Sequence, residues 1–119
     1  MLIPPKQKVR ITRHYTVQYS NPISVAAGER VKVGHEDQDF PGWMWCKAMD
    51  GRESWVPIEL LSKGNEGDEA MILQDYSARE LDVERGEEVI VEDSRHDWLL
   101  VRNARGECGW IPASDATAT

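Results

Sequence analysis

The side chains best suited to chemistry in this sequence are aromatic rather than catalytic. All five tryptophans lie in two similar stretches, residues 43–57 and 98–112, which end in Trp55-Val56-Pro57 and Trp110-Ile111-Pro112. An indole ring combines a large apolar face with one N–H donor, and tryptophan is enriched among the residues that dominate protein–protein binding energy. The two stretches therefore predict binding by aromatic contact.

Residues that could support catalysis or metal binding are scattered along the chain. The three histidines, His14, His35 and His96, have no metal-ligand spacing to one another or to the two cysteines. The sequence contains no glycine-rich phosphate loop and no nucleophile motif. The crowd of acidic residues around position 88 is interpreted as solvated surface. We therefore expect no enzyme activity, no catalytic residue, no metal and no cofactor.

An internal repeat organises the chain. Residues 28–33, Gly-Glu-Arg-Val-Lys-Val, return at 86–91 as Gly-Glu-Glu-Val-Ile-Val, and Tyr15 returns as Tyr76. Apolar and polar residues alternate in both copies, which is the period of half-buried strands, and no helical period is visible. The repeat therefore predicts two units built of β-strands.

The repeat also sets the expected domain boundaries. The first domain is predicted at residues 8–61 and the second at 70–116. Residues 62–69 between them contain no aliphatic side chain and are rich in glycine and charge, a composition typical of a linker.

The charge is negative and unevenly spread. The net charge of −7 argues against nucleic acid and anionic membrane as partners. Residues 1–61 carry 8 basic and 7 acidic side chains, whereas residues 62–119 carry 6 basic and 14 acidic ones. These opposite tendencies favour contact between the repeats or self-association, while solvated surface charge is the simpler interpretation.

The sequence gives no sign of a membrane or export segment. No apolar run approaches the length of a transmembrane helix, and the N-terminus has no apolar signal region. Two cysteines at non-equivalent positions of the repeats, Cys46 and Cys108, are predicted to be free thiols. We therefore expect a cytoplasmic protein.

The repeats share an ordered set of short motifs. The second repeat carries, in sequence, Asp75-Tyr76, Glu80-Leu81-Asp82-Val83, Gly86-Glu87, Trp98, Gly106 and Gly109-Trp110-Ile111-Pro112. The first carries Tyr15, Pro22-Ile23-Ser24-Val25, Gly28-Glu29, Gly42-Trp43, Gly51 and Trp55-Val56-Pro57. In this order and spacing, almost the whole chain resembles two tandem Src-homology-3 (SH3) domains of the variant or bacterial type. The resemblance implies an all-β fold of two tandem SH3-like five-stranded small barrels.

The family's core positions fall on apolar side chains or cysteine in both repeats. In the first repeat they are Ile11, Ile23, Val25, Val31, Val33, Cys46 and Val56. In the second they are Ile72, Leu81, Val83, Val89, Val91, Val101 and Ile111. We expect these fourteen residues to fill the interiors of the two barrels.

The resemblance also implies a ligand groove in each repeat. Family members bind proline-rich peptides as polyproline II helices across aromatic ridges. The groove residues implied here are Tyr15, Trp43, Trp55 and Pro57 in the first repeat, and Tyr76, Trp98, Trp110 and Pro112 in the second. We add Trp45, which the strand alternation places beside Trp43, as the strongest contact for a partner.

Several positions depart from the family pattern. The other tyrosine of the first strand is replaced by Arg13 and Gln74, and the tyrosine that follows the motif proline by Leu60 and Asp115. The long loop that carries acidic residues in the family is neutral in the first repeat and short in the second. We therefore expect a non-catalytic adaptor that binds a protein or proline-rich peptide by atypical rather than standard PxxP recognition.

Three alternatives stay open at this point. The chain could be a structural or regulatory subunit whose grooves are occupied by contacts between the repeats or by self-association. It could instead be a cell-wall-targeting bacterial SH3 domain, which would require export. The third concerns the stretch Ile3-Pro4-Pro5-Lys6-Gln7-Lys8, which resembles a short basic polyproline ligand for the acidic second repeat of a neighbouring chain, or is a frayed terminus.

Overall fold

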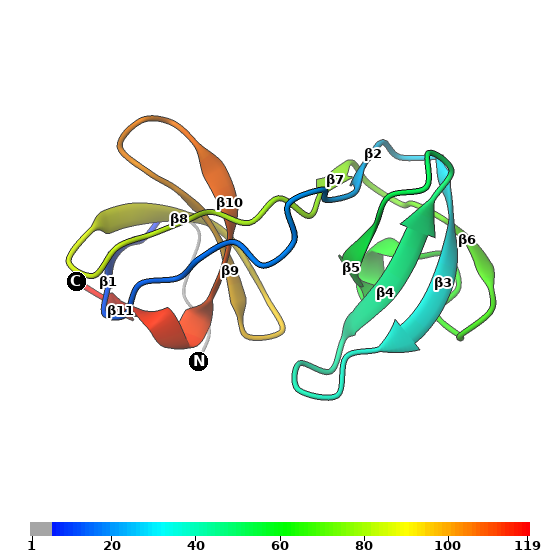
Figure 1. Cartoon of the computed structure of the whole chain (residues 1–119), viewed down its shortest axis with the longest axis horizontal. Coiled ribbons are helices and arrows are strands. Elements are labelled where there is room, and N and C mark those ends of the chain that lie inside the picture. Colours follow the sequence, from blue (N-terminus) through cyan, green and yellow to red (C-terminus); the bar gives the residue numbers. More distant parts are fainter. Residues whose placement is uncertain (1–5) are drawn as a thin grey trace. The chain divides into compact units, whose positions relative to one another are not determined.

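The computed structural model describes residues 6–119, and it consists of short antiparallel strands with two single-turn 3-10 helices (Figure 1). Residues 1–5, which include the first half of the Ile3–Lys8 stretch considered above, lie outside this description. Within the described residues, no helix has the length and apolar character needed to cross a membrane. The all-β fold class is confirmed.

The chain divides into two compact units, one of which is discontinuous in sequence. The terminal unit combines the N-terminal segment up to Gln18 with Glu80–Thr119, and the central unit is Tyr19–Arg79. The chain therefore passes from one unit to the other twice, between residues 18 and 19 and between residues 79 and 80.

The terminal unit is a five-stranded sheet in the order β10-β9-β8-β1-β11. Its elements are β1 (Lys8–Ile11), β8 (Glu88–Arg95), β9 (Trp98–Arg102), β10 (Cys108–Pro112), η2 (Ala113–Asp115) and β11 (Ala116–Ala118). Alternate side chains of β1, Val9 and Ile11, enter a core that also contains Leu81, Val89 and Leu99. In Figure 1 the blue β1 accordingly lies among the olive to red strands of the C-terminal half.

The central unit has a four-stranded sheet in the order β5-β4-β3-β6 and a short two-stranded sheet, β2-β7. Its elements are β2 (Ser24–Val25), β3 (Arg30–Glu36), β4 (Trp43–Ala48), β5 (Glu53–Pro57), η1 (Ile58–Leu60), β6 (Glu69–Met71) and β7 (Tyr76–Ser77). Its interior contains Ile23, Val31, Val33, Val56 and Ile72, all buried.

The two repeats exchange their first strands. β1 belongs to the first repeat but pairs with β8 of the second, with Val9 opposite Val89. β6 belongs to the second repeat but pairs with β3 of the first, with Val31 opposite Ala70. The compact units therefore differ from the expected domains 8–61 and 70–116. The physical reason is that both first strands have the same alternating pattern and can complete either sheet.

The segment expected to be a linker, residues 62–69, is part of the central unit. The amide of Val33 donates to the carbonyl of Asp68, and the amide of Gly67 donates to the carbonyl of Val33, both at 2.8 Å. Leu73 and Ser62 add backbone bonds to Leu60 and Met71. Glycine and charge at these positions therefore mark a surface turn that leads into β6.

The shared Gly-Glu motif forms the same turn in both units. Gly28 and Gly86 each have φ of +92°, and the following glutamates donate their amides to carbonyls three residues earlier at 3.1 Å. A β-turn with positive φ at its third residue favours glycine because a Cβ is unfavourable there. The Glu87 carboxylate also accepts the amide of Glu84 at 2.9 Å. The motif is therefore explained by the turn that precedes β3 and β8.

Both cysteines are free thiols, as predicted, but their surroundings differ. Cys46 is fully buried, and this burial raises the pKa of its thiol to about 12 because the thiolate is poorly solvated there. Cys108 is only partly buried. Because the thiolate is the reactive form, we expect a thiol reagent at pH 8 to label Cys108 rapidly and Cys46 only on unfolding. Mass spectrometry of the labelled peptides measures both rates, and equal labelling in the native protein would contradict the burial of Cys46.

Candidate functional site

In the terminal unit, three of the predicted groove residues meet in one place. The rings of Tyr15 and Trp98 pack edge to face with centroids 5.7 Å apart, and Trp98 lies directly across from Pro112 in the β9–β10 pair. Backbone bonds between Tyr15 and Val83, at 2.9 and 3.0 Å, hold the segment that carries the tyrosine. We call Tyr15, Trp98 and Pro112, all half-buried, the terminal aromatic surface.

Two acidic residues hold the chain that carries Tyr15. The buried carboxylate of Glu80 accepts the Tyr15 hydroxyl at 2.8 Å and the amide of Gln18 at 2.7 Å. Asp82 accepts the amide of Val17 at 2.7 Å. Hydrogen bonds to a carboxylate are stronger than neutral ones. Glu80 from the interior and Asp82 from the exposed side therefore fix the position of the segment that carries Tyr15.

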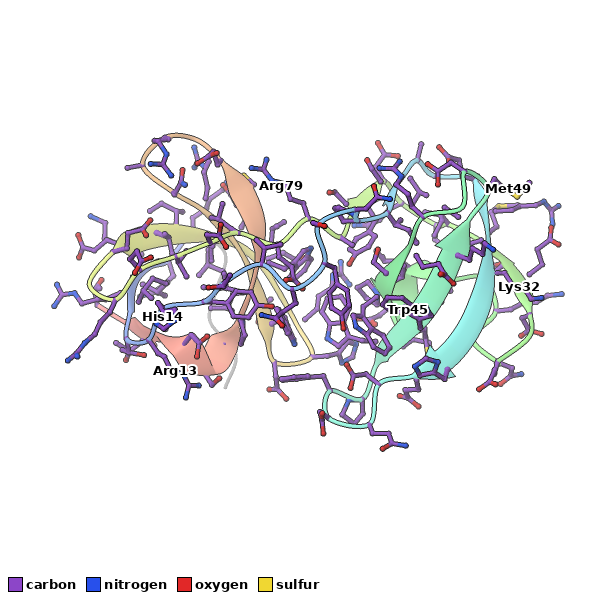
Figure 2. All side chains as sticks on the ribbon, in the orientation of Figure 1. Arg13, His14, Lys32, Trp45, Met49 and Arg79 are labelled. Atoms are coloured by element: carbon purple, nitrogen blue, oxygen red, sulfur yellow. The ribbon has the colours of Figure 1, made fainter. Side chains whose placement is uncertain are left out.

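The two residues that replace family tyrosines in this unit pair with each other. Arg13 donates Nε to Oδ1 of Asp115 at 2.8 Å, and its Nη2 also lies 2.8 Å from that oxygen. Asp115 is buried, whereas two-thirds of the Arg13 side chain is exposed. Figure 2 shows Arg13 beside the segment that contains η2. A charged pair thus stands where the family pattern has two aromatic rings.

Gly109 explains how the Glu80 segment reaches its place. A Cβ at position 109 would lie 2.7 Å from the carbonyl carbon of Glu80 and 2.8 Å from its oxygen. In the central unit, the equivalent residue is the buried Ser54, whose Oγ accepts the amide of Ile23 at 2.8 Å. The terminal unit therefore uses a close backbone approach at this position, and the central unit uses a side-chain hydrogen bond.

In the central unit, four rings form a cluster that the sequence predicted only in part. Trp45 and Trp55 are cross-strand partners with centroids 5.0 Å apart. Tyr19 packs against Trp45 at 5.5 Å, and His35 packs against Trp55 at 5.5 Å. Tyr19 and His35 are exposed, and both tryptophans are half-buried. We call these four residues the central aromatic surface; Figure 2 labels Trp45 on β4.

The remaining predicted groove residues of the two units are mostly buried. Trp43 and Trp110 are each 4% exposed, and Pro57, the cross-strand partner of Trp43, is also buried. Tyr76 is buried and donates its hydroxyl to the carbonyl of Trp55 at 2.8 Å. These four side chains support the aromatic surfaces more than they enlarge them.

The exchange regroups the predicted groove residues. The sequence placed Tyr15 with Trp43 and Trp55, but the structure joins it to Trp98. It placed Tyr76 with Trp98, but the structure joins it to Trp55. The grouping by repeat was wrong, because each tyrosine follows a first strand that completes the other repeat's sheet.

Two residues of the central aromatic surface were missed. Tyr19 lies where the chain enters the central unit, and no local motif marks it. His35 lies beyond Val33, next to a register shift in the β3–β4 pair that alters the simple alternation. The sequence offers one signal that His35 belongs to this surface, namely its position two residues after the predicted core residue Val33.

The loops beside the two surfaces also differ. In the central unit, β3 and β4 are joined by residues 37–42, where Asp37 Oδ1 accepts the amides of Asp39 at 2.9 Å and Phe40 at 3.3 Å. In the terminal unit, β8 and β9 are joined by His96 and Asp97 alone, with φ of +42° and +71°. The central surface is therefore flanked by a long ordered loop and the terminal one by a tight turn.

No metal-binding cluster accompanies these surfaces. Between Lys6 and Thr119, no three histidine, cysteine or acidic side chains are grouped so that they could hold a metal ion. The aromatic rings and the charged groups beside them are thus the candidate binding elements.

Comparison with known proteins finds one family match for each sequence repeat. Residues 8–64 match the family model described as "Variant SH3 domain", and residues 73–113 match the one described as "SH3 domain". No curated protein and no solved structure matches the chain.

Proposed function

We propose that this protein acts as a non-catalytic adaptor with atypical ligand recognition. The chain belongs to the SH3 family and carries two such domains in tandem. It is therefore a protein-interaction module. SH3 domains serve as binding modules for protein and peptide segments. The finer proposal is that the central and terminal aromatic surfaces bind different segments of a partner. Both recognise apolar or proline-rich chain without the usual basic anchor.

The observation that carries this proposal is the central aromatic surface. Four rings with centroid separations of 5.0 to 6.5 Å lie together, with Tyr19 and His35 exposed. Aromatic side chains grouped in this way provide a large apolar contact area at low entropic cost and are typical hot spots of protein interfaces. A partner segment with proline or aliphatic residues fits such a surface.

The charge pattern of the terminal aromatic surface supports atypical recognition. Glu80, the acid that accepts the Tyr15 hydroxyl, is buried and also accepts the amide of Gln18. The exposed charge where a groove tyrosine would stand is positive, from Arg13. A ligand arginine or lysine would therefore gain little here, and standard PxxP recognition with a basic anchor is not favoured.

A second candidate is a structural or regulatory subunit in which part of each groove is covered. The burial of Trp43, Pro57, Tyr76 and Trp110 favours it for those positions. The two candidates differ in what the half-buried rings do. An adaptor requires a ligand to change the solvent exposure of Trp45, Trp55 or Trp98, and a purely structural subunit does not.

We expect Trp45→Ala and Trp98→Ala to remove different parts of a peptide-array binding profile. Loss of an indole that dominates an interface costs about 2 kcal/mol, which corresponds to about 30-fold weaker binding. Met49→Ala, at an exposed residue of the same unit as Trp45, and Thr117→Ala, in the same unit as Trp98, are the matched controls. Iodide quenching of tryptophan fluorescence with and without the selected peptides provides a second reading.

Two results would contradict the adaptor proposal. Identical array profiles for wild type, Trp45→Ala and Trp98→Ala would show that neither indole contacts a ligand. Fluorescence that is unchanged by any array-positive peptide would place the binding elsewhere on the chain.

A further inference from the structure

Ion pairs join the N-terminal segment to the C-terminal half, and in each of them the segment supplies the cation. Residues 6–18 carry four basic side chains and no acidic one, whereas residues 80–119 carry ten acidic and four basic ones. Lys6 pairs with Glu92, Arg10 with Glu88 at 3.4 Å, and Arg13 with Asp115 at 2.8 Å. Each of the three pairs joins a cation of the segment to an anion of the acidic half.

The other exchanged strand, β6, carries the opposite charge. In β6, Glu69 lies opposite Lys32 of β3 and forms an ion pair with Arg30 at 3.5 Å. β3 thus presents two cations to the strand that docks on it, and the docked strand supplies an anion. Figure 2 labels Lys32 on β3.

Equivalent positions in the two repeats identify the cross-strand partners that each first strand would have without the exchange. In the observed sheets, Arg10 lies opposite Glu88 as Met71 lies opposite Arg30, and Lys8 lies opposite Ile90 as Glu69 lies opposite Lys32. If each repeat kept its own first strand, Arg10 would face Arg30 and Lys8 would face Lys32. Like charges directly opposite each other in a sheet are destabilising.

The same comparison holds at the end of the strand. Asp115 and Leu60 occupy the same place in the two repeats, as do Arg13 and Gln74. Without the exchange, Arg13 would face Leu60, and the buried Asp115 would face Gln74 and lose its cation. A buried carboxylate without a cationic partner is costly.

The core is apolar in either arrangement. Ile11 and Ile72 are the same residue type at equivalent positions, whereas Val9, opposite Val89, and Ala70, opposite Val31, differ in size and are both buried. Either strand can therefore bury apolar side chains in either sheet, although the two fill the core differently. The charged residues on the outer faces add a direct conflict to the unexchanged arrangement.

We propose that a charge code selects the exchange. Glu88 and Glu92 of β8, together with Asp115 of η2, form a docking surface for the basic N-terminal segment, and the β3 edge with Arg30 and Lys32 forms one for an acidic strand. This goes beyond the proposed function and does not depend on any ligand. In the folded protein Lys6, with a smaller effect from Arg102, holds the pKa of Glu92 below its usual range, which agrees with the N-terminal segment as the occupant of this surface.

Disulfide trapping can report which strand docks where while leaving the code intact. Ile11 lies opposite Ala116 in the β1–β11 pair, and the equivalent of Ala116 in the first repeat is Leu61, which bridges to Ile72. Ile11→Cys with Ala116→Cys therefore captures the exchanged pairing, and Ile11→Cys with Leu61→Cys captures the unexchanged one. Cys46→Val and Cys108→Ser remove the native thiols. Valine is chosen at position 46 because the equivalent residue of the second repeat is Val101.

Each variant is unfolded in urea, refolded and oxidised, and the linked peptides are identified by mass spectrometry. With native charges we expect the 11–116 link and little of the 11–61 link. In the triple charge reversal Lys8→Glu, Arg10→Glu, Glu69→Lys we expect the 11–61 link to increase several-fold at the expense of the 11–116 link. Arg105→Glu, at an exposed position in the turn between β9 and β10, changes the net charge equally and should change neither.

The outcomes decide the proposal. An 11–116 link between two chains supports the charge code as an intrachain link does. In both cases the same edge has accepted the same strand. A preference for the 11–61 link with native charges, or link yields that the triple reversal leaves unchanged, would overturn the charge code. Circular dichroism of each reduced variant separates these results from a failure to fold.

Discussion

Ile11→Ala, a substitution in the N-terminal strand, is expected to destabilise the C-terminal half of the chain. Ile11 is 1% exposed and lies in the core formed with β8, β9 and β10. Truncating a buried isoleucine to alanine costs about 2–5 kcal/mol, because apolar contacts are lost and a cavity remains. In hydrogen exchange, amides of residues 88–112 should lose protection, while those of residues 30–57 should keep it.

The matched variant is Ile72→Ala, at the equivalent position of the second repeat. Ile72 is buried in the central unit, where its backbone bonds Glu29 and Gly28 at 2.8 Å. This change should therefore deprotect residues 30–57 and spare residues 88–112. Since the exchange predicts crossed effects, a pattern in which each substitution weakens its own repeat would contradict the strand order of both sheets.

Gly109→Ala is expected to be the most damaging single methyl addition in the terminal unit. The new Cβ would lie 2.7 Å from the backbone of Glu80 and 2.8 Å from the Cβ of Leu81, and neither is the free end of a flexible side chain. Relieving this overlap requires a backbone shift, with an expected loss of about 3 kcal/mol in the free energy of unfolding. Glu80 would move with it, so the bond from Tyr15 should weaken as well.

Urea unfolding measures this loss, and Ser54→Ala is the informative control. Position 54 is the equivalent of position 109 and already accommodates a Cβ, so alanine there removes only the hydrogen bond that Ser54 Oγ accepts from Ile23. Leaving that buried amide without its acceptor should cost about 1–3 kcal/mol in the central unit. A Gly109→Ala protein as stable as wild type would show that Glu80 does not approach β10 closely.

The fold class and the interior were predictable because they depend on local pattern. All fourteen core positions named from the sequence are buried. Alternation with a period of two specifies which face of a strand is apolar, whatever strand it pairs with. The turn residues were equally local, since Gly28 and Gly86 have the positive φ that their motif implies.

The candidate site was only half predictable. Trp45 and Trp55 do meet, because neighbouring strands of a hairpin bring them opposite each other. The contact of Tyr15 with Trp98 joins residues of different repeats, and the terminal aromatic surface therefore depends on the exchange. Tyr19 and His35 escaped notice because no short motif contains either of them.

The sequence also contains a signal of the exchange. Lys8 and Arg10 would face Lys32 and Arg30 in the simple tandem arrangement, and Arg13 and Asp115 replace groove tyrosines in different repeats. The excess of acid in the second half favoured contact between the repeats, but it did not identify the partners. Aligning the repeats by position and comparing the charges across each predicted ladder would have shown the conflict.

By itself, the sequence determined that this protein consists of two small SH3 domains with apolar interiors and aromatic surfaces. These properties follow from residue type and spacing within each repeat. Only the tertiary structure decided which first strand completes which sheet, and with it which tyrosine joins which tryptophan. The reason is that two strands with the same apolar pattern fit the same core, so that the pairing depends on contacts between residues far apart in the chain.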